Sequence, residues 1–81
     1  MISGILNASS FKEVRNCIDT ILSKFKSQGV QESQIIILIN DSIRELRKLN
    51  EVKLSYDQHA NVISAEVHLT ELQLQTFNVI N

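Results

Sequence analysis

The chain contains no proline or tryptophan, two glycines and a single cysteine among its 81 residues. The one cysteine, Cys17, cannot form an internal disulfide, and no group of histidine and cysteine has the spacing of a structural zinc site. A domain of this length buries only roughly 60% of the surface of its unfolded chain. With neither a disulfide nor a metal to compensate, such a domain is marginally stable. Self-association is a common way to add stability at this size, so we expect a homodimer.

Long apolar runs and an excess of charge are also missing. The longest uncharged stretch, residues 1–11, is well short of the roughly 18 apolar residues that indicate a membrane-spanning helix. The net charge is −1, which gives no basic surplus for binding the phosphates of nucleic acids. Because an unpaired cysteine fits a reducing compartment, we expect a cytoplasmic protein that does not associate with a membrane.

The side chains that do dominate are aliphatic. Hydrophobic residues make up 43% of the sequence, and the aromatic residues are only three Phe and one Tyr, which is typical of a globular domain with an aliphatic core. No repeat, linker or low-complexity segment divides the chain. We therefore expect one domain over residues 1–81, in which residues 1–9 could form an N-terminal arm.

A first helix is predicted from Ser10 to Gly29. Ser10 and Glu13 have the spacing of a capping box, in which a hydroxyl and a carboxylate satisfy backbone amides at a helix start. Gly29 ends the pattern, since glycine readily adopts the left-handed conformation that closes helices. Between them, apolar residues recur every three or four positions and form one stripe: Phe11, Val14, Ile18, Ile21, Leu22 and Phe25.

A second helix is predicted up to Asn50, although the consecutive aliphatic residues 35–39 would also suit a buried strand. Gln31 as N-cap sets Val30 against Ile35 as a hydrophobic staple, which favours the helix. The apolar side chains span an arc of about 160°, wider than one neighbour requires, so we expect this helix to be central. The arc consists of Ile35, Ile36, Leu38, Ile39, Ile43, Leu46 and Leu49.

Two strands are predicted after these helices. Residues 51–57 and 63–69 each alternate between apolar and polar side chains, which is the period of a half-buried strand. Closing them as an antiparallel hairpin with the loop 58–61 places Tyr56 opposite Ile63 on the inner face. The same register pairs Lys53 with Glu66 on the outer face, and such pairs stabilise an antiparallel sheet.

The C-terminal segment, residues 70–81, leaves two alternatives open. Thr70 and Gln73 repeat the capping-box spacing and predict a short helix. The content of valine, isoleucine, phenylalanine and threonine suits a third strand nearly as well. The whole pattern predicts an α+β fold, in which a two-helix hairpin precedes an antiparallel β-hairpin and a short C-terminal helix (ααββα).

Few side chains offer chemistry. Cys17 is the one thiol nucleophile, and it lies at the edge of the first apolar stripe, where a half-buried structural thiol is the ordinary interpretation. His59 falls in the predicted loop and His68 on the solvent face of a strand, too far apart to share a metal. Paired catalytic carboxylates and a glycine-rich phosphate loop are missing from the sequence. We therefore expect a protein that is not an enzyme and takes no cofactor, metal or small-molecule substrate.

Two groups of side chains are candidates for binding a partner. Ile37 lies outside the apolar arc of the second helix, either as an isolated surface residue or as part of a second contact face. That predicted partner-binding face comprises Ile37, Asn40, Asp41, Arg44 and Lys48. Positive charges near the end of the same helix either complement its dipole, with acidic residues interleaved, or bind an anion or nucleic acid. This predicted cation cluster comprises Arg44, Arg47, Lys48 and Lys53.

Three functional hypotheses follow from these features. The first is a non-enzymatic, self-associating protein–protein interaction module that acts as an adaptor, an antitoxin or an inhibitor from a phage or mobile element. The second is a small dimeric regulator of transcription, because two helices before a β-hairpin match the element order of part of a winged-helix domain. The predicted hairpin loop has no Arg or Lys with which to hold phosphate, which counts against nucleic-acid binding. The third, an enzyme that uses Cys17, has the least support.

Overall fold

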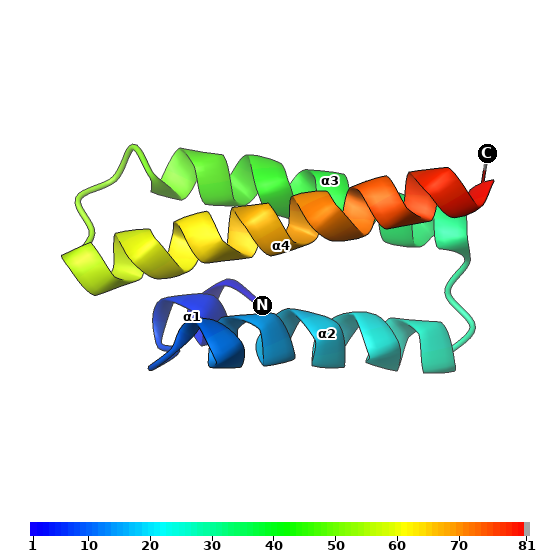
Figure 1. Cartoon of the computed structure of the whole chain (residues 1–81), viewed down its shortest axis with the longest axis horizontal. Coiled ribbons are helices and arrows are strands. Elements are labelled where there is room, and N and C mark those ends of the chain that lie inside the picture. Colours follow the sequence, from blue (N-terminus) through cyan, green and yellow to red (C-terminus); the bar gives the residue numbers. More distant parts are fainter. Residues whose placement is uncertain (81) are drawn as a thin grey trace.

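Three long helices run side by side, and a short N-terminal helix packs near one end of them (Figure 1). The computed structural model describes residues 1–80, with the side chains of residues 1–75. Its elements are α1 (Ile2–Leu6), α2 (Phe11–Ser27), α3 (Glu32–Leu49) and α4 (Tyr56–Ile80). Helix α4 contacts α1, α2 and α3, whereas α3 packs mainly on α4. The central helix is therefore α4, and not the second long helix as the sequence predicted.

The predicted α+β fold is wrong, because residues 1–80 contain no strand. The segment predicted as a β-hairpin, residues 51–69, forms the loop before α4 and the first half of that helix. Helix α4 starts at a capping box that the hairpin interpretation overlooked. Ser55 Oγ accepts the backbone N–H of Gln58 at 3.2 Å, and Gln58 Oε1 accepts the backbone N–H of Ser55 at 3.2 Å. These bonds satisfy amide donors at a helix N-terminus, so the local chemistry favours a helix at this position.

The C-terminal segment is helical, but it is not a separate short helix. Residues 70–80 continue α4 without a break, so the third-strand alternative is also wrong. Thr70 lies in mid-helix, where its hydroxyl donates a hydrogen bond to the carbonyl of Glu66 at 2.7 Å and caps nothing. Residue 81 lies outside the described residues. Although α4 is long, neither it nor any other described helix has an apolar stretch long enough to cross a membrane.

The predicted capping box at the start of α2 is confirmed, with one change of partner. Ser10 has an extended backbone, and its Oγ accepts the backbone N–H of Glu13 at 3.2 Å. The Glu13 carboxylate accepts the backbone N–H of Ser9, one residue before the cap, at 2.8 Å. This backbone hydrogen bond from Ser9 lowers the pKa of Glu13 below its ordinary value. The resulting stabilisation is present above the ordinary pKa and is lost as the pH falls through the lowered pKa.

The Ser10 cap provides the first testable prediction. Replacement of Ser10 by Ala leaves the amide of Glu13 without its side-chain acceptor, so we expect Ser10→Ala to lower the free energy of unfolding by about 1 kcal/mol. Ser9→Ala is the matched control, because Ser9 contributes its backbone N–H to Glu13. Urea denaturation followed by circular dichroism measures the free energy of unfolding of both variants. Equal losses of stability in the two variants would show that the Ser10 hydroxyl does not cap α2.

Gly29 ends α2 as predicted. Its φ is +85°, in the left-handed region that glycine adopts without a steric penalty. The backbone N–H of Val30 donates to the carbonyl of Phe25 and that of Gly29 to the carbonyl of Lys26, both at 3.1 Å. This pair of bonds is a Schellman motif, which satisfies carbonyls at a helix C-terminus. The turn between α2 and α3 is therefore fixed by local chemistry.

The core is aliphatic, as predicted, and it lies between α4 and the inner faces of the other helices. The buried positions of α3 all belong to its predicted apolar arc. Among residues 1–75, one polar side chain is buried with them: Asn61 of α4 is 5% exposed, and its Nδ2 donates to the carbonyl of Ala8 at 2.9 Å. This bond satisfies the buried amide and ties α4 to the α1–α2 loop. The buried hydrophobic residues are Ile5, Val14, Ile18, Leu22, Ile35, Ile39, Ile43, Leu46, Val62, Ala65 and Leu69.

The N-terminal residues pack onto the bundle through α1. Ile5 is fully buried in the core. A Cβ at Gly4 would lie 2.7 Å from Cys17 Sγ, so α1 can approach α2 this closely only because residue 4 has no side chain. Cys17 Sγ also lies 3.9 Å from the carbonyl oxygen of Met1. Cys17 therefore forms part of the packing between α1 and α2.

Candidate interaction surface

Helix α4 has two apolar faces on opposite sides, and the core uses only one of them. The inner face contributes Val62, Ala65 and Leu69, all fully buried. At about 100° per residue, a second set of apolar side chains lies on the opposite side of the helix, away from these three. The side of a bundle helix that faces away from the core is normally polar. The second apolar face of α4 therefore contributes little to the core of this chain.

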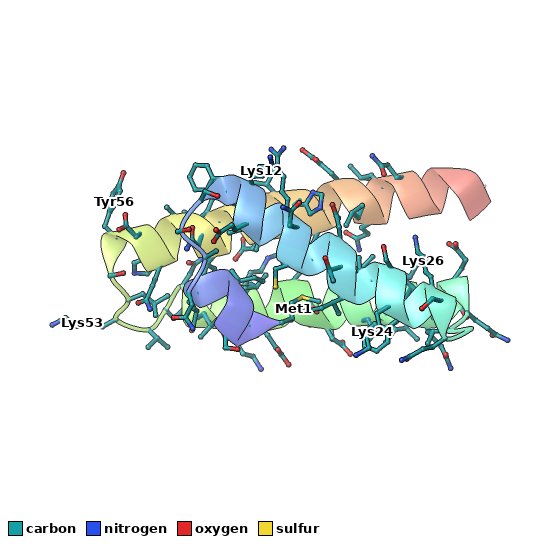
Figure 2. The ribbon with its side chains drawn as sticks, turned by 90° about the horizontal axis from the view of Figure 1, so that it is seen from below. Met1, Lys12, Lys24, Lys26, Lys53 and Tyr56 are labelled. Atoms are coloured by element: carbon teal, nitrogen blue, oxygen red, sulfur yellow. The ribbon has the colours of Figure 1, made fainter. Side chains whose placement is uncertain are left out.

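We call this second face the outer stripe. Its positions are separated alternately by four and three residues, the heptad spacing by which one helix packs along another. Tyr56 is 87% exposed and points away from the bundle (Figure 2), and three further apolar members are more than half exposed. The outer stripe comprises Tyr56, Ala60, Ile63, Val67, Thr70 and Leu74.

Phe11, at the start of α2, widens this apolar surface. Its side chain is 56% exposed and lines a hollow of about 360 Å³ together with Ile63 and Val67 of the outer stripe. Arg15 of α2 and Glu71 of α4 line the same hollow and bring opposite charges to its edge. An apolar centre with a polar rim is the usual composition of a protein-binding surface.

Polar side chains on both edges of the outer stripe are held by neighbouring helices. On the α2 side, His68 Nε2 lies 2.7 Å from Asp19 Oδ1. On the α3 side, Asn50 Nδ2 donates to Glu66 Oε1 at 3.0 Å. Hydrogen bonds on opposite edges fix the rotation of α4 about its own axis, so the outer stripe is held toward solvent.

The predicted partner-binding face on α3 is divided between two hollows. Ile37 is 57% exposed but not isolated, because it lines an apolar hollow with Phe25 and Val30. Asn40 is half-buried, and its Oδ1 accepts a hydrogen bond from Gln73 of α4. The remaining members are exposed: Asp41, Arg44 and Lys48. This face stays a prediction, and Ile37 is its member with apolar neighbours.

The predicted cation cluster is only partly brought together. Arg44 and Arg47 line a polar hollow of about 320 Å³ between α3 and α4. Lys48 is exposed on α3, and Lys53 extends from the loop at the end of the bundle (Figure 2). Neither lysine lines the hollow that the two arginines share. Anion binding at this place stays a prediction.

The side chains considered for chemistry each have a structural partner. Cys17 packs against α1, and His68 pairs with Asp19. His59 Nδ1 lies 3.5 Å from Asn50 Oδ1, and both histidines are half-buried on α4 instead of lying in a loop and on a strand. Within the described part of the chain, no three His, Cys, Asp or Glu side chains are grouped so that they could hold a metal ion.

The outer stripe was not predicted from the sequence, although its spacing is present there. Tyr56, Ile63 and Val67 recur at intervals of seven and four residues, which suits one face of a helix. The buried residues Ala65 and Leu69 are interleaved with them, and the combined pattern alternates at every second position. That alternation favoured a strand and concealed two separate helical faces.

No family model, curated protein or solved structure matches the chain. The class of this protein therefore rests on its own fold and surface. It is a small helical bundle whose central helix exposes an apolar stripe beside a hollow.

Proposed function

We propose that the chain is a non-enzymatic protein–protein interaction module that binds a helix of its partner along the outer stripe. The observation that carries this proposal is the exposure of Tyr56, Ile63 and Val67 on the side of α4 opposite the core. Large contiguous apolar patches on soluble proteins usually mark an interaction site. An adaptor, an antitoxin or an inhibitor from a phage or mobile element would each act through such a surface. The cytoplasm is its proposed location, because the unpaired thiol stays reduced there.

The spacing of the outer stripe supports a helix as the bound element. Positions separated by four and three residues form a continuous seam, into which the side chains of an apposed helix insert as knobs into holes. The hollow beside Phe11 offers room for a large apolar side chain of that helix. An added β-strand would need a sheet edge, which residues 1–80 do not provide. We therefore propose an amphipathic helix as the ligand.

The alternative of a winged-helix-like regulator loses its main support. It depended on a β-hairpin as the wing, and residues 51–69 form a loop and the first half of α4. The lysines of the predicted cation cluster also lie away from the hollow of the two arginines. We do not propose nucleic-acid binding.

Affinity capture with matched variants tests the proposed function. Wild type, a stripe variant (Ile63→Glu with Val67→Glu) and a control (Val52→Glu) are immobilised and exposed to nuclease-treated bacterial lysate. Val52 is 55% exposed in the loop before α4, so the control adds charge at a similarly exposed apolar position outside the outer stripe. We expect wild type and control to retain a protein in stoichiometric amount, which is either another protein or further copies of this chain. The stripe variant should retain at least about tenfold less, since central apolar side chains dominate binding energy.

Equal retention by all three proteins would contradict a role for the outer stripe. That role would also be contradicted if no protein is retained and the chain is monomeric at high concentration. Circular dichroism shows whether the stripe variant keeps the helix content of wild type, which separates lost binding from lost folding.

A further inference from the structure

We infer that the element bound by the outer stripe is α4 of a second copy of this chain, paired antiparallel about a twofold axis at the level of Ala65. This inference rests on the proposed function and adds to it the identity of the partner and the register of pairing. A twofold interface uses the same surface on both copies, so that surface must complement itself. The outer stripe and its surroundings meet this requirement in spacing, shape and area.

The spacing of the outer stripe is symmetrical about Ala65. Tyr56 lies nine residues before Ala65 and Leu74 lies nine residues after it. An antiparallel second copy therefore places Leu74 of one helix at the level of Tyr56 of the other. The same symmetry pairs Ile63 with Val67 and Ala60 with Thr70. Every position of the outer stripe then has a counterpart at its own level.

Phe11 favours the antiparallel orientation over the parallel one. It lines one hollow with Ala60, Ile63 and Val67 and a second hollow with Tyr56 and Ala60, so it lies on the α2 side of the outer stripe near the level of Ala60. In an antiparallel pair, the α2 sides of both copies fall on the same side of the seam, and the two Phe11 side chains flank the axis there, each beside the apolar seam. In a parallel pair, Phe11 would face the polar α3 side of the other copy, where Asn50 holds Glu66.

The area of the surface also fits a second copy. With Phe11 and Tyr56 at 56% and 87% exposure and three aliphatic side chains more than half exposed, the apolar surface is on the order of 500 Å² per copy. An interface of standard size buries about 800 Å² per partner, of which about 65% is apolar in homodimers. The outer stripe with Phe11 thus supplies the apolar part of one small homodimer interface. Its burial would add stability to a chain of 81 residues that has no internal cross-link.

The charges beside the seam are few and partly offset. In the antiparallel pair, Asp57 of one copy and Glu71 of the other lie along the same edge, and like charges there oppose association. Arg15 lines the hollow that contains Glu71 and reduces this repulsion. On the α3 edge, Glu66 of each copy lies within one residue of the axis, and Asn50 of the same copy donates a hydrogen bond to its carboxylate at 3.0 Å. The positions of the outer stripe itself carry no charge, so apolar contacts determine the pairing.

Sedimentation equilibrium tests the second copy as the occupant. Across concentrations that extend into the millimolar range, we expect wild type and Val52→Glu to reach a mass of twice the 9.2 kDa of one chain. The stripe variant, Ile63→Glu with Val67→Glu, should keep the mass of a single chain while retaining its helix content. A wild type that stays monomeric throughout would overturn the inference. If that monomer still captures another protein through the outer stripe, the proposed function stands and only the second copy is wrong.

Thiol cross-linking tests the antiparallel register without disturbing the large apolar side chains. Ala60→Cys and Thr70→Cys are made separately in a Cys17→Ser background. In the antiparallel pair, residue 60 of one copy lies opposite residue 70 of the other, whereas equal positions are about 15 Å apart along the helix axis. We therefore expect oxidation to link the two variants only when they are mixed. Efficient linking within each variant alone would overturn the antiparallel register and indicate parallel pairing.

Discussion

Ala60→Pro is expected to lower the free energy of unfolding by about 3 kcal/mol or more, whereas Tyr56→Pro changes it little. Tyr56 is the first residue of α4, where proline is well tolerated because its missing N–H has no partner within the helix. Ala60 lies one turn further on. Proline there removes a helical hydrogen bond and its ring clashes with the carbonyl of Tyr56. In the hairpin predicted from the sequence, residue 60 lies in a loop, and proline there would cost far less.

Thermal and urea denaturation of the two proline variants measure this difference. Both positions belong to the outer stripe, so a loss of self-association would affect the measured stability of both variants. Low protein concentration keeps the contribution of self-association to the measured stability small. Nearly equal stabilities of Ala60→Pro and Tyr56→Pro would contradict a continuous helix through residue 60. A large loss in Ala60→Pro alone would show experimentally that α4 replaces the predicted hairpin.

The ends of α2 and the start of α3 could be predicted from the sequence because short-range chemistry determines them. Ser10 with Glu13, and Gly29 after the last apolar position, specify a helix start and a helix end within a few residues. Gln31 is the N-cap of α3 as predicted, although its side chain makes no capping hydrogen bond. Each of these features involves neighbours in the chain and depends little on the rest of the fold.

The predicted hairpin failed because two helical faces can imitate the period of a strand. Ile63 and Val67 belong to the outer stripe, and Ala65 and Leu69 belong to the buried face, with the members of each pair four residues apart. Because the two pairs are offset by two residues, apolar side chains fall at every second position from 63 to 69. This is the pattern of a strand with one buried face. The alternation is real, but it arises from a helix that is apolar on both sides. The Ser55 and Gln58 capping box was the local signal that would have favoured the helix.

The candidate site also contains one part that the sequence predicts and one part that depends on the packed bundle. Ile37 could be identified as an apolar residue outside the core arc, because α3 has one buried face and its periodicity is clear. The outer stripe could not be identified, because that required knowing which face of α4 enters the core. Burial is a property of the packed bundle, and residues such as Phe11 and Val67 acquire their common hollow only after α2 and α4 have met.

Leu46→Ala is expected to lower the free energy of unfolding by about 2 to 5 kcal/mol, whereas Ile37→Ala changes it by less than about 0.5 kcal/mol. Leu46 is fully buried between α3 and the rest of the core, so its truncation removes apolar contacts and leaves a cavity. Ile37 is on the same helix and is 57% exposed, so its side chain is already largely in water. Because small domains have only about 5 to 15 kcal/mol of stability in total, the loss at Leu46 would be a large fraction of it.

Urea denaturation at matched protein concentration measures the free energy of unfolding of both variants. Both substitutions place an alanine in α3, so their effects on helix propensity are similar. A small effect at Leu46 would mean that α3 does not pack through its predicted apolar arc. A large effect at Ile37 would mean that the hollow it shares with Phe25 and Val30 is part of the core of the single chain. A negligible effect leaves Ile37 free to be tested as a partner contact, because a variant that folds normally can report on binding alone. The two variants therefore separate the residues that build the bundle from those that lie on its surface.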